Sequence, residues 1–403
     1  MTVASTSSSL TSEAPTAVYL DYQATTPVDP RVVDAMLPWF SERFGNAHSA
    51  QHAFGAEAAQ GVEKARGQIA DLVGAQAREI VFTSGATESN NLAIKGAARF
   101  AQRHGKGNHI VTFETEHKCV LESCFVLADE GIRTTVLKVG ADGLVDLDML
   151  AGAIEDNTVL VSAMAANNEI GVLQPMAEIG KLCRERGVLF HTDAAQAAGK
   201  IPIDVEAMSI DLMSVSGHKL YAPKGVGVLY IRRRPRARLL AEITGGGQER
   251  GARSGTLAVP LIVAMGMACE IADQEMAQET GRLVEFRRSM LAQLQEKVPD
   301  MVVNGHLEQR LAGNLNVGFP DIDVLALMRA LDDVAISTGS ACTSESVEPS
   351  YVLQALGLPR SVSAGSIRIG FGRFTTQSEI DYATRRIAEA VVAQRGGQQA
   401  AAQ

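Results

Sequence analysis

EIVFTSGATESNN, residues 79–91, joins a short apolar strand to a small-residue turn that opens a helix. Glu79–Thr83 contains consecutive Ile, Val and Phe residues, a composition that favours a buried strand. The turn Ser84–Thr87 follows at once, and the helix after it is expected to continue to about Gln102. A strand, a tight turn and a helix in this order predict one unit of an open α/β sheet.

The same alternation continues along the chain on both sides of this unit. Further helices are expected at Glu57–Val73, Asp146–Ile154 and Glu178–Arg186. The further strands are expected at His109–Phe113, Thr134–Val139, Thr158–Ala163, Val188–His191, Asp211–Val215 and Gly227–Ile231. Strands rich in Val, Ile and Leu that alternate with helices are typical of a mostly parallel sheet covered on both faces. Residues 29–273 are therefore expected to form one large α/β domain.

The C-terminal part of the chain predicts a second, smaller α+β domain. A long charged helix and three strands are expected at Gln274–Val298, Asn314–Phe319, Ala335–Ser337 and Ser366–Phe371. We assign residues 17–28 and 274–393 to this domain. The Ser/Thr-rich residues 1–16 and the Gly/Gln/Ala-rich residues 394–403 are expected to form a disordered leader and a disordered tail.

The composition of the 403 residues is that of a globular protein, with 46% hydrophobic and 21% charged residues. A net charge of −9 argues against direct nucleic-acid binding. The longest apolar run, residues 257–269, is interrupted by Pro260 and is shorter than the roughly 20 residues that span a membrane. Residues 1–16 contain no Lys or Arg, so they lack the basic residues of a targeting peptide. A cytoplasmic protein without membrane partners is expected.

Polar residues are concentrated where the predicted strands end. Gly85, Ala86 and Thr87 follow a strand, and their backbone N–H groups and hydroxyl would suit a phosphate; a simple helix cap is the alternative. Asp193 follows another strand, and Ser216–Gly217–His218–Lys219 follows the next. The acid and the lysine could form an ion pair. They could instead hold pyridoxal phosphate, with the lysine as a Schiff base and the acid at the pyridinium nitrogen. The ordered set of all three motifs favours the cofactor.

Three further segments fit a cofactor site. Asn168 follows another strand and could donate to a ring oxygen, unless it is only a turn residue. His117 follows His109–Phe113 and could stack on the ring or move a proton, unless it is a surface histidine. The Gly-rich and basic segment 245–256 could contact anions, including those of a neighbouring subunit.

The five cysteines are an odd and sparse number for a disulfide scaffold, so a reducing compartment is expected. Cys342 is surrounded by small polar residues, an environment that suits an exposed reactive thiolate. Cys183 and Cys269 lie on apolar helical faces and are expected to be core residues. Cys119 and Cys124 lie near His117 without the spacing of metal ligands, so no metal site is predicted.

These motifs resemble those of the cysteine desulfurases of the NifS/IscS type, within the class V aminotransferase family. The resemblance runs from about Val18 to about Ile387. It rests on TSGATESNN at 83–91, TEHK at 115–118, NNEIG at 167–171, SGHK at 216–219, RSGT at 253–256, GSACTS at 339–344 and SIRIGFGRFTT at 366–376. It implies the fold of type I pyridoxal-phosphate-dependent transferases, with a large α/β domain and a smaller α+β domain that carries the Cys342 loop.

The resemblance also implies roles for individual residues. Lys219 would carry the cofactor and move the Cα proton, Cys342 would accept sulfur, and His117 would stack on the ring. The other cofactor contacts would be Ala86, Thr87, Asn168, Asp193, Gln196, Ser216 and His218, with Thr256 supplied by the partner subunit of a homodimer. Arg368 and Asn46 would bind the substrate.

The implied activity is removal of sulfur from L-cysteine, giving L-alanine and a persulfide on Cys342. That sulfur would pass to an acceptor protein for iron–sulfur cluster assembly or tRNA thiolation. An iron–sulfur scaffold protein is one candidate acceptor, although the tail that docks it in housekeeping members is absent after Gln394. The alternatives are a selenocysteine lyase or related lyase that depends less on Cys342, an ordinary aminotransferase, and a sulfur-trafficking scaffold without activity.

Overall fold

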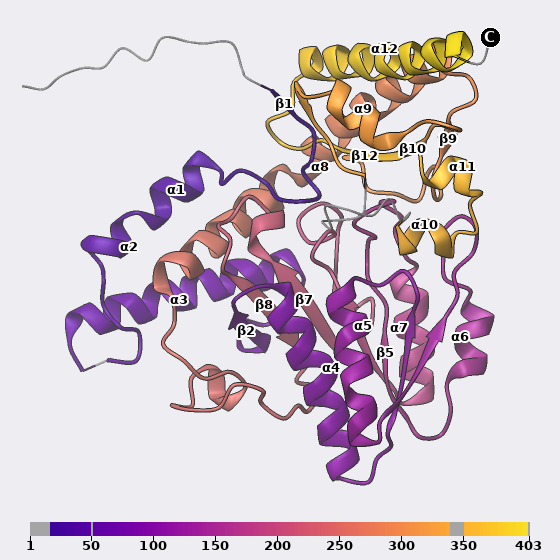
Figure 1. The fold of residues 1–403 in the computed structure, drawn as a ribbon. Helices are drawn as coiled ribbons and strands as arrows, with labels where there is room; N and C mark the ends of the chain where they lie inside the picture. Colours follow the sequence, from indigo (N-terminus) through magenta and orange to yellow (C-terminus); the bar gives the residue numbers. More distant parts are fainter. Residues whose placement is uncertain (1–16, 50, 339–349, 402–403) are drawn as a thin grey trace, which may run out of the picture.

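The structure is a computed structural model that describes residues 17–49, 51–338 and 350–401. Its centre is a seven-stranded sheet with the strand order β2-β8-β7-β6-β5-β3-β4 (Figure 1). The strands are β2 (Ile80–Thr83), β3 (His109–Phe113), β4 (Arg133–Leu137), β5 (Thr158–Ser162), β6 (Leu189–Asp193), β7 (Leu212–Ser216) and β8 (Gly227–Ile231). β8 runs antiparallel to both neighbours, and the other pairs are parallel. The expected mostly parallel sheet is therefore confirmed.

Helices cover both faces of this sheet, because alternate residues of each strand point to opposite faces. Val81 of β2 packs in one core with α4 (Ala86–Arg103) and α5 (Lys118–Phe125). Its neighbours Ile80 and Phe82 pack in the core on the other face. The helices of that core are α1 (Pro30–Met36), α3 (Ala53–Leu72), α6 (Leu147–Ala153), α7 (Met176–Arg186) and the first half of α8 (Val259–Lys297).

A separate hydrophobic core lies at the other end of α8, under α12 in Figure 1. Its antiparallel sheet has the order β12-β10-β9, and the strand β1 pairs in parallel with β11. Val18 and Leu20 therefore share this core with residues between Leu283 and Val391. The elements are β1 (Val18–Tyr19), β9 (Val302–Val303), β10 (Asn314–Gly318), α9 (Val324–Ala330), β11 (Val334–Ala335), α10 (Tyr351–Ala355), α11 (Arg360–Ser363), β12 (Ser366–Gly370) and α12 (Gln377–Ala401).

Two helix boundaries differ from the sequence prediction. The helix α8 begins at Val259 rather than Gln274, because Pro260 lies in its first turn, where a missing N–H leaves no hydrogen bond unmade. The disordered tail expected from residue 394 is wrong as far as Ala401, where α12 ends. Arg395 lies in this last part of the helix and pairs with Asp300 at 2.8 Å. The expected leader, residues 1–16, lies outside the described residues, and no helix in the described ranges is long and apolar enough to cross a membrane.

Candidate active site

The carboxyl ends of β2, β3, β5, β6 and β7 meet at one edge of the large sheet, where they open into a cavity of about 540 Å³. Crevices at this edge are the usual ligand sites of open α/β sheets. Ten of the residues singled out from the sequence line the cavity: Ala86, Thr87, His117, Asn168, Asp193, Gln196, Ser216, His218, Lys219 and Arg368. Segments more than two hundred residues apart thus converge on one space.

The N-terminus of α4 forms one wall of the cavity. Gly85 precedes the helix with φ 153° and ψ 178°, a conformation that side-chain-bearing residues rarely adopt. Within the described part of the chain no side chain caps this helix, so its first backbone N–H groups are available to an anion. Ser216 and His218 line the same cavity. The structure therefore favours the phosphate seat over the simple helix cap.

Lys219 follows β7 through a single turn of 3-10 helix, Gly217–Lys219. Its Nζ donates to the backbone oxygens of Gln23 and, at 2.7 Å, of Ala24. Among the described residues its hydrogen-bond partners are these two backbone oxygens, and no ion pair joins it to Asp193. Burial, together with the positive charges of Lys200 and Arg368, lowers the pKa of Lys219 to about 7. Such an amine is half neutral near pH 7, and the neutral form is the nucleophile.

Asp193 ends β6 as a buried carboxylate on the cavity wall. Its Oδ2 accepts from Asn90 Nδ2 at 2.7 Å, and its Oδ1 accepts from the Ala195 backbone N–H at 2.9 Å. Both carboxylate oxygens therefore accept from N–H groups, and the site presents a buried carboxylate that fits a protonated ring nitrogen.

Asn168 and Arg368 carry unpartnered polar atoms at the cavity. The Oδ1 atom of Asn168 and the Nε atom of Arg368 are buried, and neither forms a hydrogen bond with any residue that the structure describes. The other guanidinium nitrogens of Arg368 donate to the Asn168 backbone oxygen at 2.9 Å and to Asp21 Oδ1 at 2.8 Å. Buried polar groups are normally paired, so these two atoms fit a site that receives a polar ligand.

The segment that contains Cys342 begins and ends near this cavity. Ser337 pairs with Arg368 through backbone hydrogen bonds, and the Ser350 hydroxyl donates to the buried carboxylate of Glu169. Burial raises the pKa of Glu169 to about 7. Cys342 itself lies outside the described residues.

Two predicted residues are not brought to the cavity of this chain. Asn46 is exposed between α2 (Pro38–Ser41) and α3, where its Oδ1 accepts from the His48 backbone N–H at 2.9 Å. Thr256 is exposed on the loop that follows Arg253. That loop is fixed to the cavity wall, because Arg253 pairs with Glu88 at 2.7 Å.

Several residues of the site were not predicted from the sequence. The backbone oxygens of Gln23 and Ala24 hold Lys219, but backbone contacts leave no residue pattern to recognise. Asn90 binds Asp193, and its position three residues after Thr87 places both on one face of α4, a spacing that could have identified it. Cys119 also lines the cavity, beside His117.

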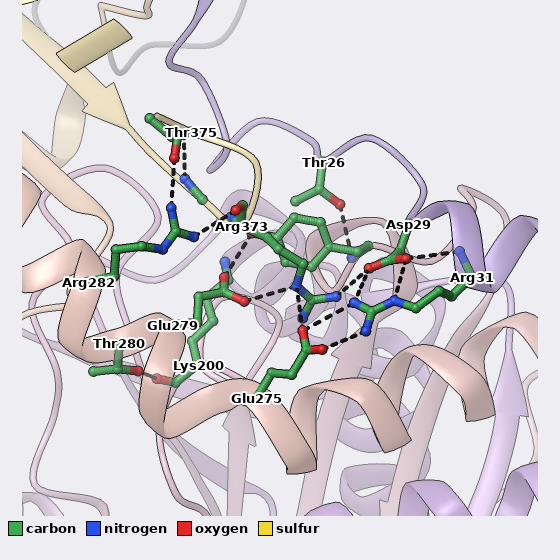
Figure 2. Close-up of polar contacts among 12 residues, drawn as sticks. Thr26, Asp29, Arg31, Lys200, Glu275, Glu279, Thr280, Arg282, Arg373 and Thr375 are labelled. Atoms are coloured by element: carbon green, nitrogen blue, oxygen red, sulfur yellow. Dashed lines mark hydrogen bonds and ion pairs between the residues drawn. The ribbon is translucent and has the colours of Figure 1, made fainter. Parts of the chain in front are cut away.

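A cluster of charged residues fastens the N-terminal segment to α8 (Figure 2). Arg373, only 8% exposed, pairs with Asp29 at 2.8 Å and with Glu279 of α8 at 3.0 Å. Arg31 bridges Asp29 and Glu275. The cluster thus joins the N-terminal segment, α8 and the segment after β12.

The geometry is that of a cofactor-dependent transferase, and the class-V aminotransferase family matches residues 18–383. The chain belongs to this family. It is 54% identical to the "Cysteine desulfurase IscS" of Rickettsia bellii, over 92% of this chain and 90% of that protein. It is 55% identical to a mouse "Cysteine desulfurase", over 92% of this chain and 80% of that protein.

Solved structures give the same picture. A "NifS-like protein" superimposes with a TM-score of 0.86 and 36% identity, covering 93% of this chain and 99% of that chain. "SspA in complex with cysteine" superimposes with a TM-score of 0.78 and 39% identity, covering 89% and 99%. The expected type I fold and the expected dependence on pyridoxal phosphate are confirmed. Among the described residues, no cluster of three or more His, Cys, Asp or Glu side chains could hold a metal.

Proposed function

We propose that this protein is a cysteine desulfurase, which uses pyridoxal phosphate to convert L-cysteine into L-alanine and transferable sulfur. The observation that carries the proposal is the meeting of Lys219, Asp193 and Arg368 at one cavity. This cofactor and an amino-acid substrate require an amine, a carboxylate and a cation. Lys219 supplies an amine of lowered pKa, Asp193 a buried carboxylate, and Arg368 a guanidinium whose Nε has no partner among the described residues.

The residues present fit the cofactor. Its phosphate would bind the first turn of α4, and its ring nitrogen would face Asp193. The remaining contacts would come from Thr87, His117, Asn168, Gln196, Ser216 and His218. When bound, pyridoxal phosphate supplies an electron sink for the charge that develops on the substrate Cα.

The side chains of this protein would then bind the substrate and move its proton. Arg368 would hold the substrate carboxylate through its unpartnered edge. Lys219 would take the Cα proton at Nζ, because an amine with a pKa of about 7 is suited to general base chemistry at neutral pH. The backbone oxygens of Gln23 and Ala24 would keep that amine in place.

Cys342 would accept the sulfur. Its thiolate would form an S–S bond with the substrate sulfur while the Cβ–S bond of the substrate breaks. The electron pair of the broken bond stays with Cβ, which gains a proton and becomes the methyl group of alanine. The product on the protein is a persulfide, which an acceptor protein for iron–sulfur assembly or tRNA thiolation would remove.

We further infer a homodimer in the cytoplasm. Leu37, Phe40, Phe44 and Phe54 are each at least 55% exposed on the arm formed by α1, α2 and the start of α3 (Figure 1). A group of exposed aromatic and aliphatic side chains is typical of a protein interface. A second copy that covers this arm could also receive Thr256, which does not line the cavity of its own chain.

The test is incubation of the purified protein with L-[35S]cysteine, with measurement of alanine and of labelled sulfur by peptide mass spectrometry. We expect one alanine per sulfur, label on Cys342, and loss of both products in Lys219→Ala. Cys342→Ala should lose sulfur transfer from cysteine; if it releases sulfide at the wild-type rate, the persulfide step is wrong and the lyase alternative holds. 3-Mercaptopyruvate with aminated cofactor in place of alanine would identify an aminotransferase.

A further inference from the structure

Four residues, three of which line the cavity, are joined by consecutive hydrogen bonds from Asp193 through Asn90 and Cys119 to His117. Asn90 Nδ2 lies 2.7 Å from Asp193 Oδ2 and 3.1 Å from Cys119 Sγ. Cys119 Sγ lies 3.0 Å from His117 Nδ1. We propose that Asn90 and Cys119 act together as positioning residues, which fix the orientation of the His117 ring and hold its hydrogen on Nε2.

The direction of the chain is set at its Asp193 end. A carboxylate only accepts hydrogen bonds, so the amide nitrogen of Asn90, and not its oxygen, faces Asp193. The amide nitrogen has two hydrogens, and the second points to Cys119 Sγ. Asn90 is fully buried, so no water competes for these hydrogens.

The thiol of Cys119 then has its own hydrogen left to donate. Burial, with a smaller effect of the Asp193 charge, raises the pKa of Cys119 to about 12. The side chain is therefore a thiol at neutral pH. Because its sulfur accepts from Asn90, its S–H can be directed at His117 Nδ1.

The His117 end of the chain sets the tautomer. His117 is the N-cap residue of α5, and its Nδ1 also accepts from the Cys119 backbone N–H at 3.2 Å. A backbone N–H can only donate, so Nδ1 carries a lone pair and the ring hydrogen resides on Nε2. The backbone bond is long, so the thiol provides the second contact that limits rotation of the ring.

This arrangement has a chemical consequence in the cavity that His117 lines. An Nε2–H presents a hydrogen-bond donor on the far edge of the ring, whereas the opposite tautomer would present a lone pair there. The Asn90 amide also holds the Asp193 carboxylate in place, so one set of contacts orients both residues. The inference deepens the proposed function, but its spectroscopic test does not depend on that function.

The test compares Cys119→Ala, which removes the donor, with Cys119→Ser, which keeps a donor of similar size. Cys124→Ala is the matched control, because Cys124 is a buried thiol on the same helix without a hydrogen bond to His117. Protein labelled with 15N-histidine is measured by NMR with and without pyridoxal phosphate, and His117→Asn identifies the His117 signals. Steady-state kinetics with L-cysteine are measured on the same samples.

In the wild type, Cys119→Ser and Cys124→Ala, we expect the His117 Nδ1 signal of an unprotonated, hydrogen-bonded nitrogen. In Cys119→Ala, we expect this signal to be shifted or to be broadened by exchange. Misplacement of a positioned group lowers the rate of the chemical step, so kcat should fall about tenfold in Cys119→Ala, with a smaller change in KM and recovery in Cys119→Ser. A hydrogen on Nδ1 in the wild type overturns the proposal, as does an unchanged spectrum in Cys119→Ala.

Two other outcomes are distinguishable. Equal loss of activity in the serine and alanine variants, with labelled sulfur on Cys119, would make this thiol a sulfur carrier and would overturn its positioning role. A wild-type protein that forms no alanine but has the expected His117 spectrum would overturn the proposed function and support the positioning chain.

Discussion

Removal of the Glu249 carboxylate is expected to destabilise the protein and to loosen the Gly-rich loop, residues 245–256. Glu249 lies in this loop, yet its side chain is only 2% exposed. Its two oxygens accept from Arg66 at 2.8 and 2.9 Å, and one of them also accepts from the Phe82 backbone N–H of β2 at 2.9 Å. One carboxylate therefore fastens the loop to α3 and to the edge of the large sheet.

The size of the effect follows from what Glu249→Ala leaves behind. Arg66 would remain as a buried charge without its bidentate partner, and removal of one member of a buried pair costs about 3–5 kcal/mol. Arg66 keeps its bond to the Ile80 carbonyl at 2.8 Å and to Glu63 at 3.0 Å. We therefore expect the lower end of that range, about 3 kcal/mol.

The assay is urea unfolding of the holoenzyme, followed by fluorescence and circular dichroism. Glu249→Gln retains an acceptor for Phe82 and should lose less stability than Glu249→Ala. The double variant Arg66→Met/Glu249→Leu removes both charges and should recover much of the loss, because replacing a buried pair by apolar residues is often nearly neutral. Cofactor retention after dialysis should fall with Glu249→Ala, because the loop continues to Arg253 and Thr256.

Two results would refute this reasoning. The first is a free energy of unfolding for Glu249→Ala that lies within about 0.5 kcal/mol of the wild-type value, which is the range of ordinary surface substitutions. The second is a double variant as unstable as Glu249→Ala. The loss of stability would then come from packing and not from the uncompensated charge of Arg66.

Three further predictions concern the cavity. The rate at which the apoprotein binds pyridoxal phosphate covalently, measured by absorption spectroscopy, should reach half of its maximum near pH 7, because the Lys219 amine is protonated below its pKa of about 7. A midpoint near pH 10 would contradict this prediction. Glu169 has a pKa of about 7 in the folded protein and about 4.5 in the unfolded chain, so the folded protein binds its proton more tightly. The resulting stabilisation is fully present below pH 4.5 and is lost as the pH rises through 7. Glu169→Gln should remove about 3 kcal/mol of the difference in unfolding free energy between pH 4.5 and pH 8; an unchanged difference would contradict it. Arg368→Lys should raise KM for cysteine about tenfold with an unchanged melting temperature, because an ammonium cannot replace the planar fork; an unchanged KM would exclude Arg368 from substrate binding.

The sequence predicted the large sheet and the cavity well because both depend on local patterns. Asp193 and Ser216 are the last residues of their strands, as their position after apolar runs indicated. In a parallel sheet all such ends lie at the same edge, so residues that end neighbouring strands must meet. This geometric rule, rather than any one motif, is why His117 and Lys219 could be placed in one site in advance.

The residues that escaped prediction depend on contacts between distant segments. Lys219 is held by backbone oxygens about two hundred residues earlier in the chain, and no side-chain type records such a contact. Cys119 was considered as a metal ligand because its neighbours in sequence were visible, whereas its partner Asn90 belongs to another helix. Pro260 was taken as an interruption, because only the tertiary structure places it in the first turn of α8.

The pairing of β1 with β11 has a consequence for the time course of synthesis. Val18 emerges from the ribosome early, but Val334, its partner in the strand pair, is added roughly 300 residues later. At about 5–20 residues per second, the first strand waits on the order of 15–60 s for its neighbour. The Gln23 side chain also donates to the Gly313 backbone oxygen at 2.9 Å, so the segment that holds the Lys219 amine gains its last contacts only after most of the chain has been made. The enzyme would therefore become able to load its cofactor late in its own production.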